Sequence, residues 1–183
     1  PNDHRLISLV SMPIKIFTKL LANKVQRCII PIISKNQYGF IKTRNIQDYL
    51  AWSFEYIHMC HKSNKEIVIF KVDFEKAFDK INYGAILYML KHLGLGDKWI
   101  RWINNILNTA SASVILNGVP GKKIKCKCGV RQGDPLSPLL IVIAAELLQI
   151  LINQAWHNGH ISTPIEQPPT MSYPIIQYVD DTL

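Results

Sequence analysis

Three aspartates stand where they could act together. Asp73 closes the segment 67–73, which is rich in β-branched residues, and Asp180 and Asp181 follow the short apolar segment 175–179. Because β-branched residues favour extended backbone, both segments are predicted to be strands, the first of them mostly buried. If the two strands are neighbours in one sheet, the three carboxylates converge at one edge of it.

A cluster of carboxylates has a definite chemistry. Carboxylates without a nearby base repel each other and raise one another's pKa unless a cation neutralises them. Their hard oxygens suit Mg²⁺, which keeps several waters and accepts substrate phosphates into its shell. Two such ions roughly 3.5–4 Å apart would activate an attacking 3′-hydroxyl and stabilise a leaving pyrophosphate. For either acidic segment taken alone, a plain turn or helix N-cap remains the alternative, because Asp is common at both.

The acids belong to a longer series of short blocks. In chain order these blocks are 5–9 (RLISL), 37–40 (QYGF) followed by Arg44, 73–79 (DFEKAFD), 130–138 (VRQGDPLSP) and 178–181 (YVDD). Together they resemble the motifs of reverse transcriptases, most closely those of the non-LTR (LINE-type) retrotransposon family, with group II intron enzymes as more distant relatives. The resemblance runs from about residue 4 to the end of the chain.

The resemblance implies an α+β fold: the fingers and palm of a right-hand polymerase, with a small antiparallel palm sheet packed on helices. It implies that Asp73 and Asp180 are the principal catalytic metal ligands, that Asp181 lies beside them, and that the carbonyl of Phe74 is a further ligand. The cofactor it implies is a pair of Mg²⁺ ions, for which Mn²⁺ would substitute.

Further residues are implied to bind the nucleotide. Backbone amides around Lys76 and Ala77 would meet the incoming triphosphate, as a tight turn presents N–H groups to phosphate. Arg44 would close on that triphosphate from the fingers. The ring of Phe78 would lie under the sugar and leave no room for a 2′-hydroxyl, which favours dNTP over rNTP; an ordinary core phenylalanine is the alternative.

The block 130–138 is implied to lie along the nascent base pair. Gln132 would hydrogen-bond sugar or base and so help to place template and dNTP, and Gly133 would allow close backbone approach. Arg131 either contacts the template or forms a salt bridge nearby. Asp134 followed by Pro135 predicts a helix N-cap with proline at the first helical position, which is a structural role.

The elements that must position these residues follow from periodicity. Apolar residues recur at helical spacing in five segments: 12–29, 46–62, 83–93, 97–108 and about 138–154. An alternating pattern around Asn117-Gly118 predicts a β-hairpin over 113–128. The apolar run 138–152 is short for a membrane span and contains Glu146, so it is predicted to be a buried helix.

Composition and charge complete the prediction. Of the 183 residues 48% are hydrophobic and 19% charged, which excludes a disordered or collagen-like chain. The formal net charge of +8 favours polyanionic partners, and residues 1–65 hold ten basic but only three acidic residues. We therefore expect a basic, helical, fingers-like lobe over 1–65 and a palm over 66–183. Since only two residues follow Asp181, the return strand of its hairpin is expected to be missing and the palm C-terminally incomplete.

The function predicted from the sequence is RNA-directed DNA polymerisation. The partners would be an RNA template, a DNA primer and dNTPs, with no membrane. Two alternatives remain open at this stage. One is a catalytically inactive retroelement relic that at most binds nucleic acid, and the other is part of a group II intron-type maturase.

Overall fold

The helix α6 (Ser137–His157) is the centre of the fold. The computed structural model describes residues 8–165, 174–179 and 181–183. Among the described residues, α6 is a helix long and apolar enough to cross a membrane. The core helix of a soluble protein can have the same length and composition. Its residues 139–143 are all at most 4% exposed. The prediction of a buried helix is therefore confirmed for this stretch, and the helix extends three residues further than predicted.

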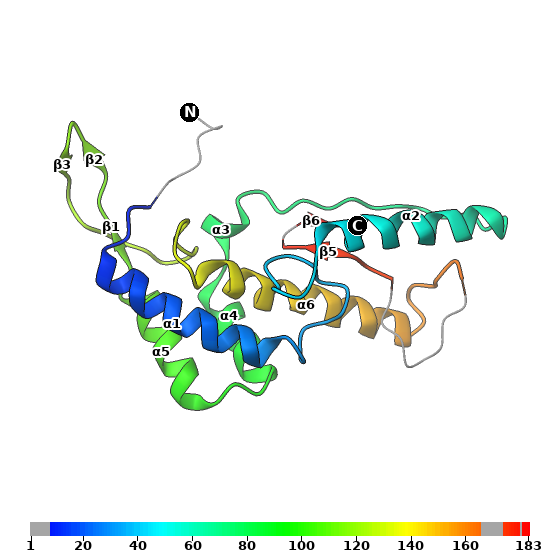
Figure 1. Cartoon of the computed structure of the whole chain (residues 1–183), viewed down its shortest axis with the longest axis horizontal. Coiled ribbons are helices and arrows are strands. Elements are labelled where there is room, and N and C mark those ends of the chain that lie inside the picture. Colours follow the sequence, from blue (N-terminus) through cyan, green and yellow to red (C-terminus); the bar gives the residue numbers. More distant parts are fainter. Residues whose placement is uncertain (1–7, 166–173, 180) are drawn as a thin grey trace.

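Two long helices pack directly on α6, and a third packs on one of them. The helices α1 (Met12–Ile29) and α4 (Tyr83–His92) both pack against α6, and α5 (Asp97–Asn108) packs against α4 (Figure 1). Phe17 of α1 meets Trp102 of α5 edge to face, with ring centroids 6.4 Å apart. One continuous hydrophobic core results, in which Ile29, Ile86 and Ile143 are fully buried.

The helix α2 (Ile46–Lys62) extends beyond this core, toward the end of the molecule that lies away from α5 (Figure 1). Its bounds and those of α1 agree with the predicted segments, and α4 ends one residue earlier than predicted. These helices were predictable because amphipathic periodicity is a local signal.

The predicted hairpin is also confirmed. It is built from four two-residue strands: β1 (Ser111–Ala112) pairs with β4 (Ile124–Lys125), and β2 (Ile115–Leu116) pairs with β3 (Val119–Pro120). Asn117 and Gly118 have φ of 49° and 81°. Positive φ at both central residues is the requirement of a type I′ turn, whose twist matches that of paired strands.

The prediction of a mostly buried strand over 67–73 is wrong. Val68 is 80% and Phe70 73% exposed, and this segment pairs with the rest of the described structure only through a bridge between Val72 and Thr182. Its β-branched composition indicated an extended backbone, but burial of a strand depends on what covers its two faces, which composition does not report.

The expectation of a missing return strand is also wrong. The strand β5 (Gln177–Tyr178) pairs antiparallel with β6 (Asp181–Thr182), and Ile176 and Leu183 continue the ladder with two hydrogen bonds of 2.9 Å. Gln37 forms a parallel bridge to Gln177 on the other side of β5. The result is a small mixed sheet in the order Gln37, β5, β6, Val72.

Candidate active site

A single bridge between Val72 and β6 brings two predicted acids to opposite positions. Val72 donates its N–H to the Thr182 carbonyl at 2.8 Å, and Thr182 donates back to Val72 at 2.9 Å. In antiparallel pairing the residue after Val72 lies opposite the residue before Thr182, so Asp73 lies opposite Asp181. Asp180 lies outside the described residues.

The surroundings of these carboxylates suit a cation. Within the described ranges the ion pair between Lys80 and Glu75 is the one salt bridge, so neither Asp73 nor Asp181 is neutralised by a basic side chain there. Burial raises the pKa of Tyr49 on α2, and the negative charge of Asp181 raises that pKa further. No group of three potential ligands forms among the residues that the structure describes. Two carboxylates that form no salt bridge within the described residues are of the oxygen-ligand type that a hard divalent ion prefers.

The chain after Asp73 forms a tight turn. Ala77 donates its N–H to the Phe74 carbonyl at 3.2 Å, and Lys76 has φ of 55°, a left-handed conformation uncommon outside glycine. The turn leads into the short helix α3 (Ala77–Lys80). The Phe74 carbonyl has a second lone pair, so its bond to Ala77 does not prevent it from binding a metal.

The helix α3 is held against the loop 129–133. Val130 donates to the Phe78 carbonyl at 2.6 Å, and Gly129 donates to the Ile81 carbonyl at 2.8 Å. A β-carbon at Gly129 would lie 2.4 Å from the carbonyl oxygen of Asp79, and the φ of Gly129 is 78°, so both space and conformation require glycine. The half-buried Phe78 packs against the core. The structure thus places two separate sequence blocks side by side.

Gln132 and Asp79 join these two blocks through their side chains. The Gln132 amide donates to Asp79 Oδ1 at 3.3 Å. Gly133 next to it is exposed and has φ of 94°. Asp79 was assigned no site role from the sequence, because nothing in its neighbourhood along the chain points to residue 132.

The predicted N-cap at Asp134 is wrong in position. Asp134 Oδ1 accepts the N–H of Leu136 at 2.8 Å, which is an Asx-type turn, and the helix begins only after Leu136. The proline in the first turn is Pro138 instead of Pro135. The structural role predicted for Asp134 is retained, since it is buried and orders the turn.

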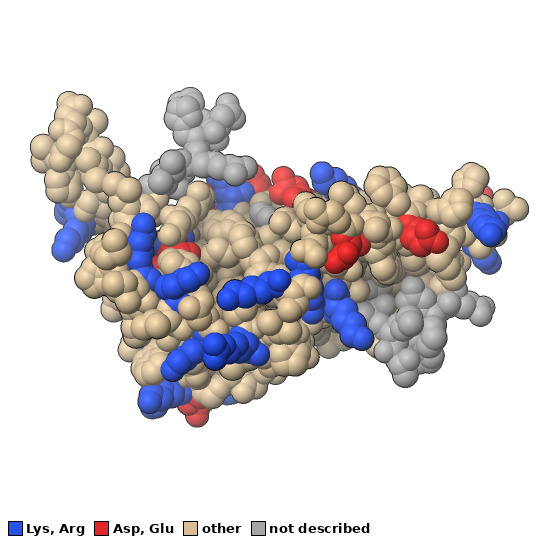
Figure 2. Space-filling view, viewed as in Figure 1, with Lys and Arg blue, Asp and Glu red and all other residues tan. Residues whose placement is uncertain are grey.

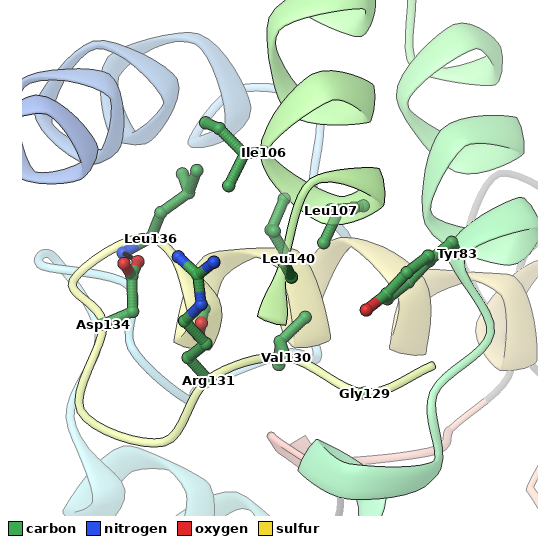
Figure 3. Close-up of a pocket in the computed structure, with 11 residues that line it drawn as sticks. Tyr83, Ile106, Leu107, Gly129, Val130, Arg131, Asp134, Leu136 and Leu140 are labelled. Carbon is green, nitrogen blue, oxygen red and sulfur yellow. Dashed lines mark hydrogen bonds between the residues drawn. The ribbon is translucent and has the colours of Figure 1, made fainter. Parts of the chain in front are cut away.

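Arg131 points into a small pocket at the start of α6 (Figure 3). Tyr83, Val130 and Leu140 also line this pocket, which has a volume of about 20 Å³, room for about one water. Arg131 forms no salt bridge in the described parts of the chain. The structure therefore does not provide the nearby ion-pair partner that was one of its two predicted roles.

Arg44 holds the loop that precedes it. Its guanidinium donates to the carbonyls of Ser34 and Gln37 and, at 3.2 Å, to that of Ile33. Burial lowers the pKa of Arg44, and the nearby carboxylate of Glu146 opposes that shift. Arg44 also borders an open groove of about 450 Å³, whose other lining residues are Tyr38, Phe40, Ile41, Lys42, Asn45, Ile46, Gln47 and Tyr178.

Glu146 anchors the same loop from α6. It accepts hydrogen bonds from the backbone N–H of Ser34, at 3.1 Å, and from the Ser34 hydroxyl. Burial raises the pKa of Glu146, while its bonds to Ser34 and the charge of Arg44 lower it. Three rings lie near the groove: Tyr49 packs edge to face against Tyr38 and Tyr178, with centroids 6.0 and 6.3 Å away.

The side chain of Gln37 contacts the turn that precedes Asp180 and Asp181, which its sequence block did not predict. Its side chain is fully buried, and its Oε1 accepts the N–H groups of Gly39 and Val179, both at 2.9 Å. Its Nε2 donates to the Val179 carbonyl at 3.3 Å. The signal that could have found it is a lone amide side chain inside the otherwise aromatic and glycine block 37–40.

Sequence comparison identifies the family. The profile of the family described as reverse transcriptase (RNA-dependent DNA polymerase) matches residues 1–183. This chain belongs to the reverse transcriptase family. The α+β fold predicted from its motifs is consistent with that family's fingers and palm.

Several relatives of this reverse transcriptase chain come from transposable elements. It is 23% identical over its full length to the transposon TX1 uncharacterized 149 kDa protein of Xenopus laevis. It is 32% identical, over 70% of its length, to a Pol polyprotein from the type-1 retrotransposable element R2 of Popillia japonica. It is 26% identical, over 81% of its length, to the R2DM Pol polyprotein of Drosophila melanogaster. The chain spans 14%, 20% and 14% of these relatives, respectively.

Membership sets the general chemistry of the site. Reverse transcriptases use divalent metal ions and act on a nucleic-acid template and primer with deoxynucleoside triphosphates. The LINE-type resemblance found in the motifs is confirmed by the R2 and TX1 relatives. The intron-maturase alternative is not favoured.

Proposed function

We propose that this chain carries the polymerase centre of an RNA-directed DNA polymerase that extends a DNA primer with dNTPs along an RNA template. The observation that carries the proposal is the bridge between Val72 and Thr182, which sets Asp73 opposite Asp181 although 108 positions separate them in sequence. Neither acid has a cationic partner among the described side chains. The proposal needs both the juxtaposition of the two acids and their lack of a basic partner. Carboxylates already neutralised by lysine or arginine would bind a metal ion less well.

The proposed metal site consists of Asp73, Asp181, the Phe74 carbonyl and Asp180, the last of which lies outside the described residues. Two Mg²⁺ ions, or Mn²⁺ in their place, would activate the primer 3′-hydroxyl and stabilise the leaving pyrophosphate. The protein's part is to hold Asp181 on β6 and Asp73 on the segment that is bridged to β6 at Val72, so that the ligands are brought together before substrate binds.

The proposed nucleotide site lies around α3. The turn at Lys76 and Ala77 would direct backbone N–H groups toward the triphosphate. The backbone of Phe78 is held by its carbonyl bond to the Val130 N–H, and its half-buried ring packs against the core. We propose that this packing lets the exposed part of the ring act as the barrier beneath the sugar. Gln132, tied to Asp79, would contact the nascent base pair. Arg44 is proposed to reach the triphosphate from the loop that it now holds.

The proposed template and primer contacts are Arg131, Gln132 and Gly133, together with the basic N-terminal region. Lysines and arginines gather over α1 (Figure 2), whose exposed basic residues are Lys15, Lys19, Lys24 and Arg27. The sequence of α1 contains no acidic residue. Such a surface binds the phosphates of a nucleic acid independently of their sequence. We assign residues 1–65 to the fingers and 66–183 to the palm on this basis.

The test is primer extension by the natural polypeptide that contains these residues, with an RNA template, a DNA primer, dNTPs and Mg²⁺. We expect Mg²⁺-dependent synthesis by the wild type and its loss in Asp73→Asn and Asp181→Asn, since each substitution removes a charged ligand. The matched control is Asp97→Asn, which changes an exposed acid at the start of α5 and should leave synthesis unchanged.

Folding must be checked in the same preparations. Circular dichroism and urea unfolding should show that both site variants remain folded. Normal extension by folded Asp181→Asn would refute the metal-site assignment, and an inactive wild type would refute the proposed function and leave the inactive-relic reading.

A further inference from the structure

We propose that Gln37 is a positioning residue for the polymerase centre, through its contacts with the residue that directly precedes Asp180 and Asp181. This inference rests on the proposed function for its catalytic consequence, but its structural part stands on hydrogen bonds alone. Gln37 itself would touch neither metal nor substrate.

The carboxamide of Gln37 matches the backbone of Val179 at both polar groups. Oε1 accepts the Val179 N–H at 2.9 Å and Nε2 donates to the Val179 carbonyl at 3.3 Å. The same Oε1 accepts from Gly39 at 2.9 Å, which keeps the amide in one orientation. A buried amide that satisfies a donor and an acceptor of one residue specifies both the place and the rotation of that residue.

Val179 needs such support because its backbone is strained. Its φ is 63°, in the left-handed region that a β-branched residue strongly disfavours. Conformations of this kind persist only where the surroundings over-determine them, and they cluster at functional sites. Without the bonds of Gln37 to Val179 and Gly39 the turn would be free to relax, and Asp181, two residues after Val179, would be held less precisely opposite Asp73.

The position of Gln37 is fixed in turn by the loop that contains it. Tyr38 donates to the Gln177 carbonyl at 2.8 Å, and Gln177 donates to the Asn36 carbonyl at 2.9 Å, so the backbone on both sides of Gln37 is tied to β5. Arg44 holds the Gln37 carbonyl. The fingers block 37–40 is therefore connected to the YVDD turn by a continuous set of hydrogen bonds.

The first test measures the turn itself, without metal or substrate. Amide hydrogen exchange in the ¹⁵N-labelled chain should show that Gln37→Met, which keeps the length of the side chain but removes its polar atoms, accelerates exchange at Val179. The matched control is Gln149→Met. Gln149 is also fully buried, but among the described residues it bonds to the side chains of Asn36 and Asn153 and not to Val179. In Gln149→Met, amide exchange at Val179 should be no faster than the overall loss of stability of that variant explains.

The second test measures catalysis in the natural polypeptide. For Gln37→Met we expect kcat to fall about 10- to 100-fold, the effect typical of residues that orient metal ligands, with the KM for dNTP and the Kd for primer–template unchanged. Gln149→Met, compared at equal folded fraction, should retain the wild-type kcat. A structural role alone would lower the amount of active protein without this selective loss.

Either of two results would overturn the proposal: Val179 exchange as slow as in the control, or full kcat in folded Gln37→Met. If Gln37→Met does not fold, Gln37→Asn replaces it, because an amide one methylene shorter remains polar but cannot reach both groups of Val179. The same selective effects are then expected, and their absence overturns the proposal. If the wild type shows no synthesis at all, the proposed function fails, and the exchange experiment still decides whether Gln37 fixes the turn.

Discussion

Gly39 lies directly against Val179. A β-carbon at Gly39 would fall 2.4 Å from Val179 Cγ2 and 2.5 Å from the Val179 backbone nitrogen. These separations are far below van der Waals contact, and one of the two atoms is backbone, which cannot rotate away. The glycine of the block 37–40 is thus required by the residue that precedes the YVDD acids.

Gly39→Ala should therefore displace the turn and reduce synthesis strongly. Overpacking of this kind costs about 1–3 kcal/mol of unfolding free energy. Urea unfolding and primer extension on the same preparation measure the two effects. The control is Gly96→Ala, where an added β-carbon meets nothing within 4 Å. That variant should retain activity and lose at most about 1 kcal/mol, because alanine is a poorer N-cap for α5. Wild-type activity in Gly39→Ala would contradict the packing.

Substitution of Phe78 by a smaller residue should weaken discrimination against ribonucleotides. Phe78→Val opens space where the 2′-hydroxyl would lie, so incorporation of rNTP relative to dNTP should rise, as measured by single-nucleotide extension with each substrate. Phe17→Val is the control, since Phe17 packs on Trp102, away from α3. An unchanged ratio in Phe78→Val would return Phe78 to an ordinary core role.

Replacement of Arg44 should affect both the loop and the nucleotide. Arg44→Ala removes bonds to three carbonyls and should lower the unfolding free energy by about 1–3 kcal/mol. If Arg44 also reaches the triphosphate, the KM for dNTP rises in addition.

Arg44→Lys separates these two effects. A lysine keeps the charge but lacks the planar fork that spans several carbonyls. We therefore expect a loss of stability close to that of Arg44→Ala together with a smaller rise in KM. An unaltered KM in both variants would restrict Arg44 to holding the loop.

Glu146 should make stability depend on pH. Burial raises its pKa in the folded chain, so the folded state binds the proton more tightly than the unfolded state does. Its contribution to stability is therefore fully present below the unfolded pKa and is lost as the pH rises through the folded pKa. Urea unfolding of the wild type from pH 4 to 8 should show this fall.

Glu146→Gln should remove that part of the pH dependence. Its Oε1 can still accept from Ser34, and the variant should be at least as stable as the wild type at pH 7, with the difference shrinking toward acid pH. Glu55→Gln, at an exposed site on α2, is the control and should leave the pH profile unchanged. If Glu146→Gln keeps the wild-type dependence of stability on pH, burial of Glu146 does not raise its pKa in the folded chain.

The sequence by itself determined the helices, the hairpin turn and the family. The helices α1 and α2 occupy the predicted segments because amphipathic periodicity and helix ends are read from residues within one or two turns. Asn117-Gly118 predicted its hairpin for the same reason, since the required φ values are a property of those two residues. The blocks around Asp73 and Asp181 identified the family without any structure.

Only the tertiary structure decided how distant segments meet. It showed that 67–73 is largely exposed and, within the described residues, pairs only at Val72, and that β6 returns along β5. It also showed that Gln37 hydrogen-bonds Val179, which lies 142 positions further along the chain. The physical reason is that sheet pairing and burial depend on contacts between segments remote in the chain, while propensity describes each segment alone. A buried amide such as Gln37 is defined by its partners, and those exist only once the chain has folded.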